Sequence, residues 1–264
     1  MRSPFSAFLS FAMAVLMLMG CPIRLTAAEN NFPFRPGERM VFGVRWAFIP
    51  AGEGVLEVMP VEHYKGIPSY HFVFTAKTNE FVDLIYKVRD RVDSYVDTGM
   101  THSVYYQKHH QGRSKKEVTV SFDWESQQAQ YALFDEKKEA IPIKPGTFDP
   151  LSVFFAFRLY DPNSLKEIRI PVTDGKKCIP GGARVMKREK IDVAGMAYDT
   201  FLVEPDLEHI GGVFKKSPNA KLQIWVTADS RHIPVRIKSK VVVGSFVAEL
   251  ISYEDGSVPS PEKE

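Results

Sequence analysis

Neighbouring histidines, His109 and His110, with His102 a few residues before them, are the nearest approach to a metal site in this chain. Imidazole nitrogens bind transition metals in sets of three or four donors. In a strand, however, adjacent side chains point to opposite faces, so His109 and His110 cannot share one ion without a bulge or a turn. No helical His-x-x-x-His pattern completes a donor set. We therefore predict no metal site, and interpret the pair as the polar end of a strand.

Groups for covalent or acid–base catalysis are not brought together by spacing either. The chain has no Gly-x-Ser-x-Gly elbow, and Cys178 follows two lysines with no base indicated nearby. Glu53 and Glu57 share a strand face but would lie about 13 Å apart, too far to act on one bond. We predict no catalytic residue and no cofactor. Carboxylates assembled from separate strands stay open, so a hydrolase for cell-wall or lipid substrates remains a third hypothesis.

Aromatic side chains give the remaining chemical signal, because they alternate with polar residues along several segments. The set comprises Trp46, Tyr70, Phe72, Phe74, Phe122, Trp124 and Trp225. Alternation places such residues on one face of a sheet. Two interpretations stay open. Either these rings form a core that is filled beneath packed helices, or they line a concave apolar face that binds an acyl chain, a lipid or an apolar polypeptide.

The first 28 residues have the order of an export signal: Arg2, an uncharged apolar run from Phe5 to Met19, and then cleavage signals. Leu18 to Cys21 matches a bacterial lipobox, in which Cys21 would be lipidated, whereas Thr26 to Ala28 suits an ordinary signal peptidase. An uncleaved anchor of about 20 apolar residues is a third interpretation, weakened by serines in the run. We predict a signal peptide over residues 1–28 and a mature protein that is periplasmic or associated with the outer membrane.

Charge and cysteine content argue against two classes of protein, namely nucleic-acid binders and disulfide-stabilised folds. Removing residues 1–28 takes away Arg2 and Arg24, so the 34 basic residues fall to 32 and equal the 32 acidic ones. Nucleic-acid binding draws on a basic excess, so we expect no nucleic-acid partner. Cys178 would be left without an intrachain partner, so no disulfide framework holds the fold. Membrane contact is expected only through a lipid on Cys21.

Period-two alternation of apolar and polar residues dominates the chain, which indicates strands with one covered face. The clearest case is Lys116 to Trp124, where Val118 and Val120 interleave with polar residues. The other expected strands are 39–46, 52–59, 70–77, 88–96, 104–109, 130–134, 168–172, 198–203, 222–227, 234–240 and 242–253. Because the gaps are of hairpin length, the sheet should be largely antiparallel.

Two segments break this alternation and predict short helices. Asn79 to Ile85 has apolar residues at helical spacing, and Asp149-Pro150 supplies a capping acid before a proline at the first helical position of a helix over Pro150 to Tyr160. Asp174 to Gly182 is expected to be a loop between two halves of one sheet, with a domain boundary as the alternative. We predict a mainly β fold, a strongly curved antiparallel sheet or half-barrel with one or two short packed helices. It should form a single domain over residues 34–254, followed by a disordered tail over 255–264.

The order of several short motifs resembles a known family. The motifs are Val44-Arg45-Trp46, Ile49 to Glu53, Tyr86 to Asp90, Asp149 to Ser152 and Leu222 to Asp229, with Pro234 downstream. This series resembles the bacterial envelope family called domain of unknown function 3108, from about Phe34 to Tyr253. The resemblance implies a secreted or lipid-anchored β-rich protein and supplies no catalytic residues. By layout, the chain is also similar to curved-sheet envelope carriers that hold lipoprotein acyl chains in a half-barrel.

These observations favour a non-catalytic envelope protein that binds an acyl chain, a lipid or an apolar polypeptide in a concave sheet. A scaffold or assembly protein for envelope partners is the alternative, which an exposed flat apolar patch without a cavity would favour. The two hypotheses differ in one structural feature, namely whether the concave face leaves room for a guest.

Overall fold

The structure is a computed structural model that describes residues 31–112, 114–207, 220–241 and 244–256. The expected signal peptide over 1–28, the candidate lipidation site Cys21, the start of the last expected strand at Val242 and residues 257–264 of the expected tail lie outside the described residues. From Phe32 onward the chain forms one compact unit.

Within the described residues, fifteen strands form one sheet. Those before the second helix are β1 (Glu38–Trp46), β2 (Ile49–Tyr64), β3 (Ile67–Thr78), β4 (Arg89–Asp97), β5 (Ser103–Gln111), β6 (Lys115–Asp123), β7 (Gln128–Leu133), β8 (Glu136–Lys137) and β9 (Ile141–Pro142). Those after it are β10 (Glu167–Thr173), β11 (Cys178–Val193), β12 (Met196–Pro205), β13 (Lys221–Thr227), β14 (Pro234–Val241) and β15 (Gly244–Asp255).

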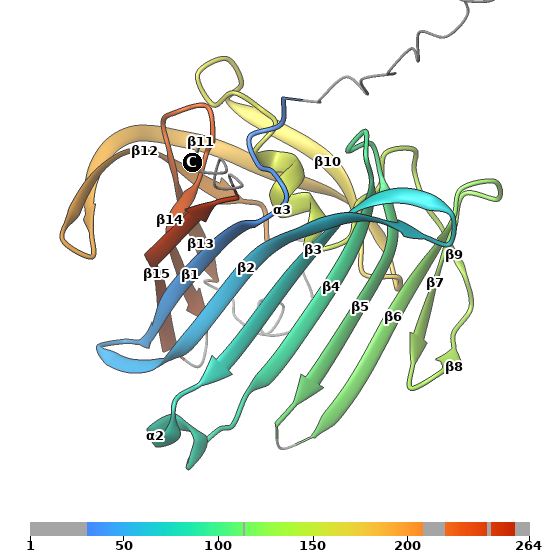
Figure 1. Cartoon of the computed structure of the whole chain (residues 1–264), viewed down its shortest axis with the longest axis horizontal. Helices are drawn as coiled ribbons and strands as arrows, with labels where there is room; N and C mark the ends of the chain where they lie inside the picture. Colours follow the sequence, from blue (N-terminus) through green and yellow to red (C-terminus); the bar gives the residue numbers. More distant parts are fainter. Residues whose placement is uncertain (1–30, 113, 208–219, 242–243, 257–264) are drawn as a thin grey trace, which may run out of the picture. The chain divides into compact units, whose positions relative to one another are not determined.

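The strand order is β10-β11-β12-β13-β14-β15-β1-β2-β3-β4-β5-β6-β7-β8, and β9 pairs with β7. All strand pairings are antiparallel, and β1 joins the two halves by pairing with both β15 and β2. The sheet is strongly curved and is not closed into a barrel (Figure 1). The expectation of a mainly β, curved antiparallel fold is confirmed.

Alternation along the strands produces the core on the concave side. On β1, Met40 and Phe42 are buried, and on β3 the Phe72 side chain is fully buried. Val120 in β6, which the alternation placed on the apolar face, is also fully buried. Each such side chain removes apolar area from water, worth roughly 1.5–3 kcal/mol per residue.

The helix α3 (Ser152–Phe157) fills part of the concave face and lies between β4 and β10 (Figure 1). Its Phe155 ring stacks on Phe72 with ring centroids 3.9 Å apart, and Phe34 meets Phe155 edge-on at 5.5 Å. The regular helix is shorter than the predicted Pro150 to Tyr160. The N-cap position is Leu151, and Asp149 holds the turn that leads into the helix, because its Oδ1 accepts the N–H groups of Leu151 and Ser152 at 2.8 and 3.0 Å.

A buried polar cluster holds the start of α3 against the sheet. The Oδ2 atom of Asp149 accepts hydrogen bonds from the hydroxyls of Ser94 in β4, Ser103 in β5 and Ser152 in α3, at 2.6, 2.6 and 2.7 Å. All four side chains are buried. A buried carboxylate with this many donors is well satisfied, so the cluster fixes α3 against two strands.

One prediction along the chain was wrong. Asp174 to Gly182 was expected to be a loop, but strand β11 begins at Cys178 and pairs with β10 from Thr173↔Cys178 onward. Only a tight turn over 174–177 separates the two strands. Strand β15 also extends to Asp255, the first residue of the expected tail.

Candidate functional site

An apolar cleft with a volume of about 700 Å³ opens at the end of the sheet where β1, β3 and β14 finish. We call it the open-end cleft. Its apolar lining residues are Val44, Trp46, Ala51, Ala76, Val82, Ile85, Tyr86, Val88, Val241 and Phe246. Glu53, Lys77, Thr78 and Ser239 add a few polar groups to the wall. The cleft has the size and the mostly apolar lining typical of small-molecule sites, which run from about 300 to 1,000 Å³.

The open-end cleft continues the concave core. On β1, Val44 and Trp46 follow the buried Phe42 on the same face, because side chains two residues apart share a face. On β3, Ala76 lies four residues beyond the buried Phe72. The part of the concave face next to Phe72 is covered by α3, whereas the part lined by Trp46 and Ala76 is left as a cleft.

Trp46 forms one wall of the cleft. Its ring stacks on Phe246 of β15, with centroids 6.4 Å apart and ring planes at 12°. A side chain at Gly244 would collide with it, since a Cβ there would lie 2.6 Å from Trp46 Nε1, and the φ of Gly244 is +124°. The absence of a side chain at Gly244 therefore leaves the space that the indole ring occupies.

A one-turn helix, α2 (Glu80–Asp83), forms the opposite wall of the cleft with the residues that follow it. Asn79 caps it, because its Oδ1 accepts the N–H of Val82 at 2.9 Å, and its Nδ2 donates to the carbonyl of Pro50 at 2.6 Å. Val82 is buried. The helix is thereby tied to the start of β2.

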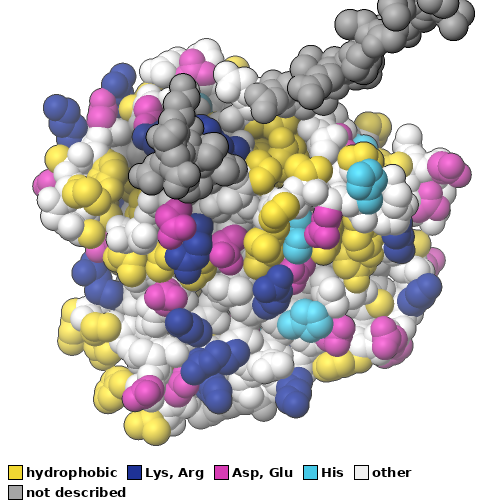
Figure 2. All heavy atoms as spheres, in the orientation of Figure 1, with side chains coloured by type: hydrophobic (Ala, Val, Ile, Leu, Met, Phe, Trp, Pro, Cys, Tyr) yellow, Lys and Arg dark blue, Asp and Glu magenta, His cyan; other side chains and the backbone are white. Residues whose placement is uncertain are grey.

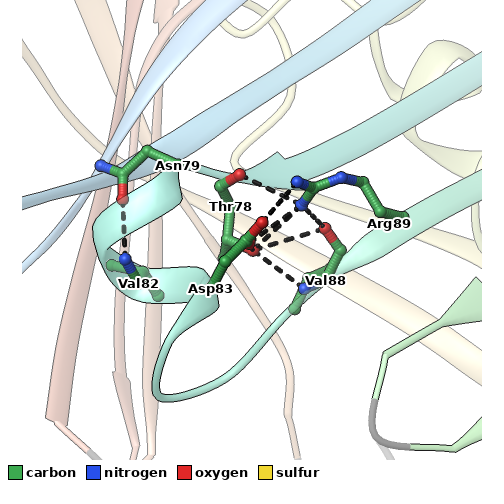
Figure 3. A network of polar contacts seen from close by, with 6 residues as sticks. All are labelled: Thr78, Asn79, Val82, Asp83, Val88 and Arg89. Carbon is green, nitrogen blue, oxygen red and sulfur yellow. Dashed lines mark hydrogen bonds and ion pairs between the residues drawn. The ribbon is translucent and has the colours of Figure 1, made fainter.

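A polar network fastens the other side of this segment to β4 (Figure 3). The Arg89 guanidinium donates to Asp83 Oδ2 at 2.6 Å, to the carbonyl of Val88 at 2.6 Å and to the carbonyl of Thr78 at 3.1 Å. The Thr78 hydroxyl accepts the N–H of Val88 at 2.9 Å and also bonds Asp83. Hydrogen bonds from Arg89 and Thr78 hold the pKa of Asp83 below its ordinary value. The segment is therefore built to keep one conformation.

The seven aromatic residues singled out from the sequence lie in different surroundings. Phe72 is buried under Phe155, and Tyr70 packs edge-on against Phe34 with centroids 5.6 Å apart. Phe74 is half-buried against the same core. Of the seven, Trp46 lines the open-end cleft. Assignment of these residues to ligand binding stays a prediction.

The remaining three have partners of their own. Phe122 and Trp124 stack on each other at 6.0 Å, and Trp124 Nε1 donates to the Ser103 carbonyl at 2.9 Å. Trp225 is buried and donates from Nε1 to Glu189 Oε1 at 3.0 Å. These rings are fixed by contacts within the protein.

The titratable residues considered for chemistry are held in separate pairs. His110 Nδ1 lies 2.5 Å from Asp90 Oδ1, whereas the nearest acid to His109 is Glu117 at 3.9 Å. Glu53 pairs with Lys77 at 3.2 Å and Glu57 pairs with Arg39 at 3.3 Å. In the described ranges, no group of three or more histidine, cysteine or acidic residues is placed to hold a metal ion.

Cys178 is half-buried and carries no disulfide. Its Sγ lies 3.6 Å from Thr147 Oγ1, beside the segment that leads into α3.

Sequence reasoning missed one compact charged cluster. The ring of His71 in β3 lies between two carboxylates, with Nδ1 2.7 Å from Glu62 of β2 and Nε2 2.9 Å from Asp93 of β4. Arg91 donates to Asp93 from Nε at 2.9 Å and from a terminal nitrogen at 2.7 Å. Burial, with smaller effects of nearby charges, raises the pKa of the neighbouring Tyr95 to about 12. The residues come from three strands, so only the strand register reveals the cluster.

Across the described part of the chain, no helix has the length and apolar character needed to cross a bilayer. No curated protein matches the sequence. Among solved structures, the chain is similar to a β-barrel-like protein of domain of unknown function DUF1849 from Brucella abortus. That similarity has a TM-score of 0.54 and 9% identity, over 84% of this chain and 98% of that one.

Two further solved structures overlap at lower scores. A candidate exported protein with a YmcC-like fold from Bacteroides fragilis has a TM-score of 0.29 and 9% identity, over 84% of this chain and 98% of that one. A candidate lipoprotein from Parabacteroides distasonis has a TM-score of 0.27 and 11% identity, over 84% of this chain and 97% of that one. The model of the family described as protein of unknown function (DUF3108) matches residues 41–251, which run from β1 to β15 and include every lining residue of the open-end cleft. By this match the chain belongs to the DUF3108 family.

Proposed function

We propose that this protein works in the bacterial cell envelope after export, and that it holds an acyl chain or the hydrocarbon part of a lipid in the open-end cleft. The observation that carries the proposal is the apolar volume of about 700 Å³ beside a core that is otherwise covered by α3. Export is supported by the order of charge, apolar run and cleavage signals in residues 1–28.

Energetics favour a guest that comes from a membrane. Burying a methylene from water is worth about 0.8 kcal/mol, so a chain of a dozen methylenes gains roughly 10 kcal/mol relative to water. The same chain in a bilayer is already removed from water. Exchange between a bilayer and an apolar cleft is therefore near balance and needs no catalytic group.

Polar groups on the cleft wall suit the other end of such a guest. Lys77, Thr78 and Ser239 lie on the wall of an otherwise apolar cleft. Ligand sites commonly use a few polar groups to orient a mainly apolar molecule. Thr78 already bonds Asp83 and Lys77 pairs with Glu53, so the Ser239 hydroxyl is the donor that a carboxylate or ester at the end of an acyl chain would meet here. The cleft also weighs against the assembly hypothesis, which rested on a flat apolar patch without a cavity.

The test uses Trp46 as a reporter. A dibrominated stearic acid quenches tryptophan on contact, so titration should quench the Trp46 part of the emission with saturation. Trp46→Phe should abolish this component, whereas Trp124→Phe should keep it, because Trp124 stacks on Phe122 away from the cleft.

A blocking variant completes the experiment. Ala76→Trp places a large ring in the cleft and should abolish saturable binding of the brominated acid. Ala197→Trp introduces the same ring at an exposed position of β12 and should bind as the wild type does. Equal binding by Ala76→Trp and the wild type, or no saturable quenching at all, would refute the proposal.

A further inference from the structure

Large apolar side chains project into solvent around the mouth of the open-end cleft. They belong to the turn between β1 and β2 and to the α2 segment, and we call them the apolar rim: Phe48, Phe81, Leu84, Ile85 and Tyr86. Phe48 is 87% exposed and Leu84 is 85% exposed, close to the exposure of free side chains. Figure 2 shows hydrophobic side chains gathered at the end of the protein where Figure 1 places α2 and the β1–β2 turn.

The sequence predicted that the short helices would be packed, but the apolar residues Phe81, Leu84 and Ile85 of the first one are exposed. Because α2 has only one turn, it buries Val82 and turns Phe81 outward. The network around Arg89 and the cap at Asn79 fix the backbone on both sides (Figure 3). The backbone of Asn79 is also fixed to β2, because its N–H donates to the Ala51 carbonyl at 3.0 Å. The rim is thus held exposed by polar contacts.

We propose that the apolar rim docks on the surface of a lipid bilayer and sets the mouth of the open-end cleft against the acyl chains. This proposal rests on the proposed function, since it names the source of the guest. It differs from the expectation that a lipid on Cys21 would be the membrane contact.

The composition of the rim fits the interface of a bilayer. Phenylalanine and leucine at the tips can enter the acyl boundary, while a tyrosine suits the level of the headgroups. Lys87 is exposed and directly follows Tyr86, so its ammonium group can reach lipid phosphates, whereas Lys77 at the end of β3 is paired with Glu53. One exposed acid, Glu80, lies among them. A neutral bilayer should therefore suffice, with anionic lipid adding a smaller gain.

Continuity with the cleft favours a bilayer over a protein partner. Ile85 and Tyr86 belong both to the rim and to the lining of the cleft. A bilayer that meets the rim therefore lies at the mouth, and a chain could enter the cleft without crossing water. Separate protruding side chains, unlike a flat patch, also suit insertion into a fluid phase.

A local fluorescent probe tests docking on the full chain. Leu84→Trp adds a tryptophan at the tip of the rim, and Val61→Trp adds one at an exposed apolar position of β2, about 40 Å from the rim along that strand. With vesicles of phosphatidylcholine and phosphatidylglycerol at 3:1 that carry brominated acyl chains, the added emission of Leu84→Trp should shift to the blue and be quenched at least twofold. That of Val61→Trp should not change. Equal responses of the two probes would overturn the proposal, because a lipid on Cys21 tethers both alike.

A second variant separates docking from binding in the cleft. Phe48→Ser/Leu84→Ser should weaken flotation with these vesicles at least tenfold while it keeps saturable binding of the dibrominated stearic acid. Val61→Ser/Ile251→Ser removes two exposed apolar side chains elsewhere and should float as the wild type does. Retained flotation of the rim variant would refute docking, as would a dimer in solution that the rim substitutions dissolve without any vesicle binding. If Ala76→Trp loses acyl binding but floats as the wild type does, docking of the rim does not depend on a guest in the cleft, and the two proposals can be tested separately.

Discussion

Strand register brings the buried Asp93 of β4 against the buried His71 of β3, and the half-exposed Arg91, two residues before Asp93 on the same strand, completes the charged cluster. Burial alone would raise the pKa of the Asp93 carboxyl. Hydrogen bonds from His71 and Arg91 outweigh burial and hold that pKa below its ordinary value. The unfolded chain therefore takes up this proton at a higher pH than the folded chain. The resulting stabilisation is present above about pH 4 and is lost as the pH falls through the folded-state value.

Asp93→Asn should expose this dependence. At pH 7 the variant should lose about 1–3 kcal/mol of unfolding free energy, because charge-assisted hydrogen bonds are replaced by weaker ones. Below the ordinary aspartate pKa the difference from the wild type should shrink, since the unfolded wild-type chain then takes up a proton that the folded chain still excludes. Urea unfolding at pH 7 and pH 3 measures both values. Asp199→Asn, which takes an exposed carboxylate from Arg188, is the control and should have a smaller effect. A difference that is independent of pH would contradict the assignment.

A buried ion pair ties α3 to the sheet. Arg158, which ends α3, lies 2.8 Å from Glu38 Oε1 of β1, and both side chains are at most 2% exposed. The contact has ion-pair distance without hydrogen-bond geometry, and among the described residues no further side chain or backbone group bonds the Glu38 oxygens. Burial raises the pKa of Glu38, while Arg158 opposes that shift. Arg158 also donates to the carbonyls of Pro33 and Arg231.

Removing one partner of this pair should be costlier than removing both. Glu38→Met or Arg158→Met alone should lower the unfolding free energy by about 3–5 kcal/mol, because each leaves a buried charge without its partner. The double variant should lose clearly less than the sum of the single losses. Chemical denaturation of the four proteins of this cycle gives the coupling. Strictly additive losses would show that the two groups do not interact in the folded state.

At the scale of elements, alternation in the sequence was enough to predict most strands, and the two segments that break it predicted both short helices. It could not sort the aromatic faces, because packing between distant segments decides them. Phe72 and Trp46 follow the same pattern, yet Phe72 is covered by Phe155 from α3 while Trp46 faces the open-end cleft. Periodicity identifies a face, but the element that covers the face comes from elsewhere in the chain.

The α2 segment should matter more for binding than for stability. Arg89→Gln removes the donors that join Asp83, Val88 and Thr78, so the walls formed by Ile85 and Tyr86 should lose their fixed positions. We expect dibrominated stearic acid to bind three- to tenfold more weakly and amides of residues 80–87 to exchange faster with deuterium. Arg188→Gln breaks a comparable exposed pair with Asp199 and serves as the matched control. Unchanged affinity would show that the network does not shape the cleft.

At the scale of the whole sheet, strand β11 shows why the sequence misled. Pro180, Gly181 and Gly182 are typical of a loop, yet they pair in register with β10. Gly181 is required there by close packing, since a Cβ would lie 2.6 Å from Val172 Cγ2. Composition alone cannot distinguish a glycine that makes a turn from one that lets two strands approach.

The open side of the sheet is bridged by the segment over 143–148. Ile143 N donates to the Gln127 carbonyl near β7, Ser103 N of β5 donates to the Thr147 carbonyl, and Phe148 N donates to the Pro171 carbonyl of β10, at 2.9, 3.1 and 2.9 Å. The turn between β10 and β11 reaches the same region, because Gly175 lies against Val120 and Tyr131. The two ends of the sheet are therefore held near each other without strand pairing.

Gly175→Ala tests this near closure. A Cβ at Gly175 would lie 2.9 Å from Val120 Cγ2 and 3.0 Å from Tyr131 Cβ, and the φ of +80° adds strain. Gly195 has a similar φ of +83°, but no atom lies within 4 Å of the added carbon. Gly195→Ala therefore adds backbone strain without a steric clash. Gly175→Ala should therefore cost about 1–3 kcal/mol more than Gly195→Ala in urea unfolding, the usual range for overpacking a filled site. Equal costs would mean that the β10–β11 turn does not press against β6 and β7, and that the 143–148 segment alone holds the ends of the sheet together.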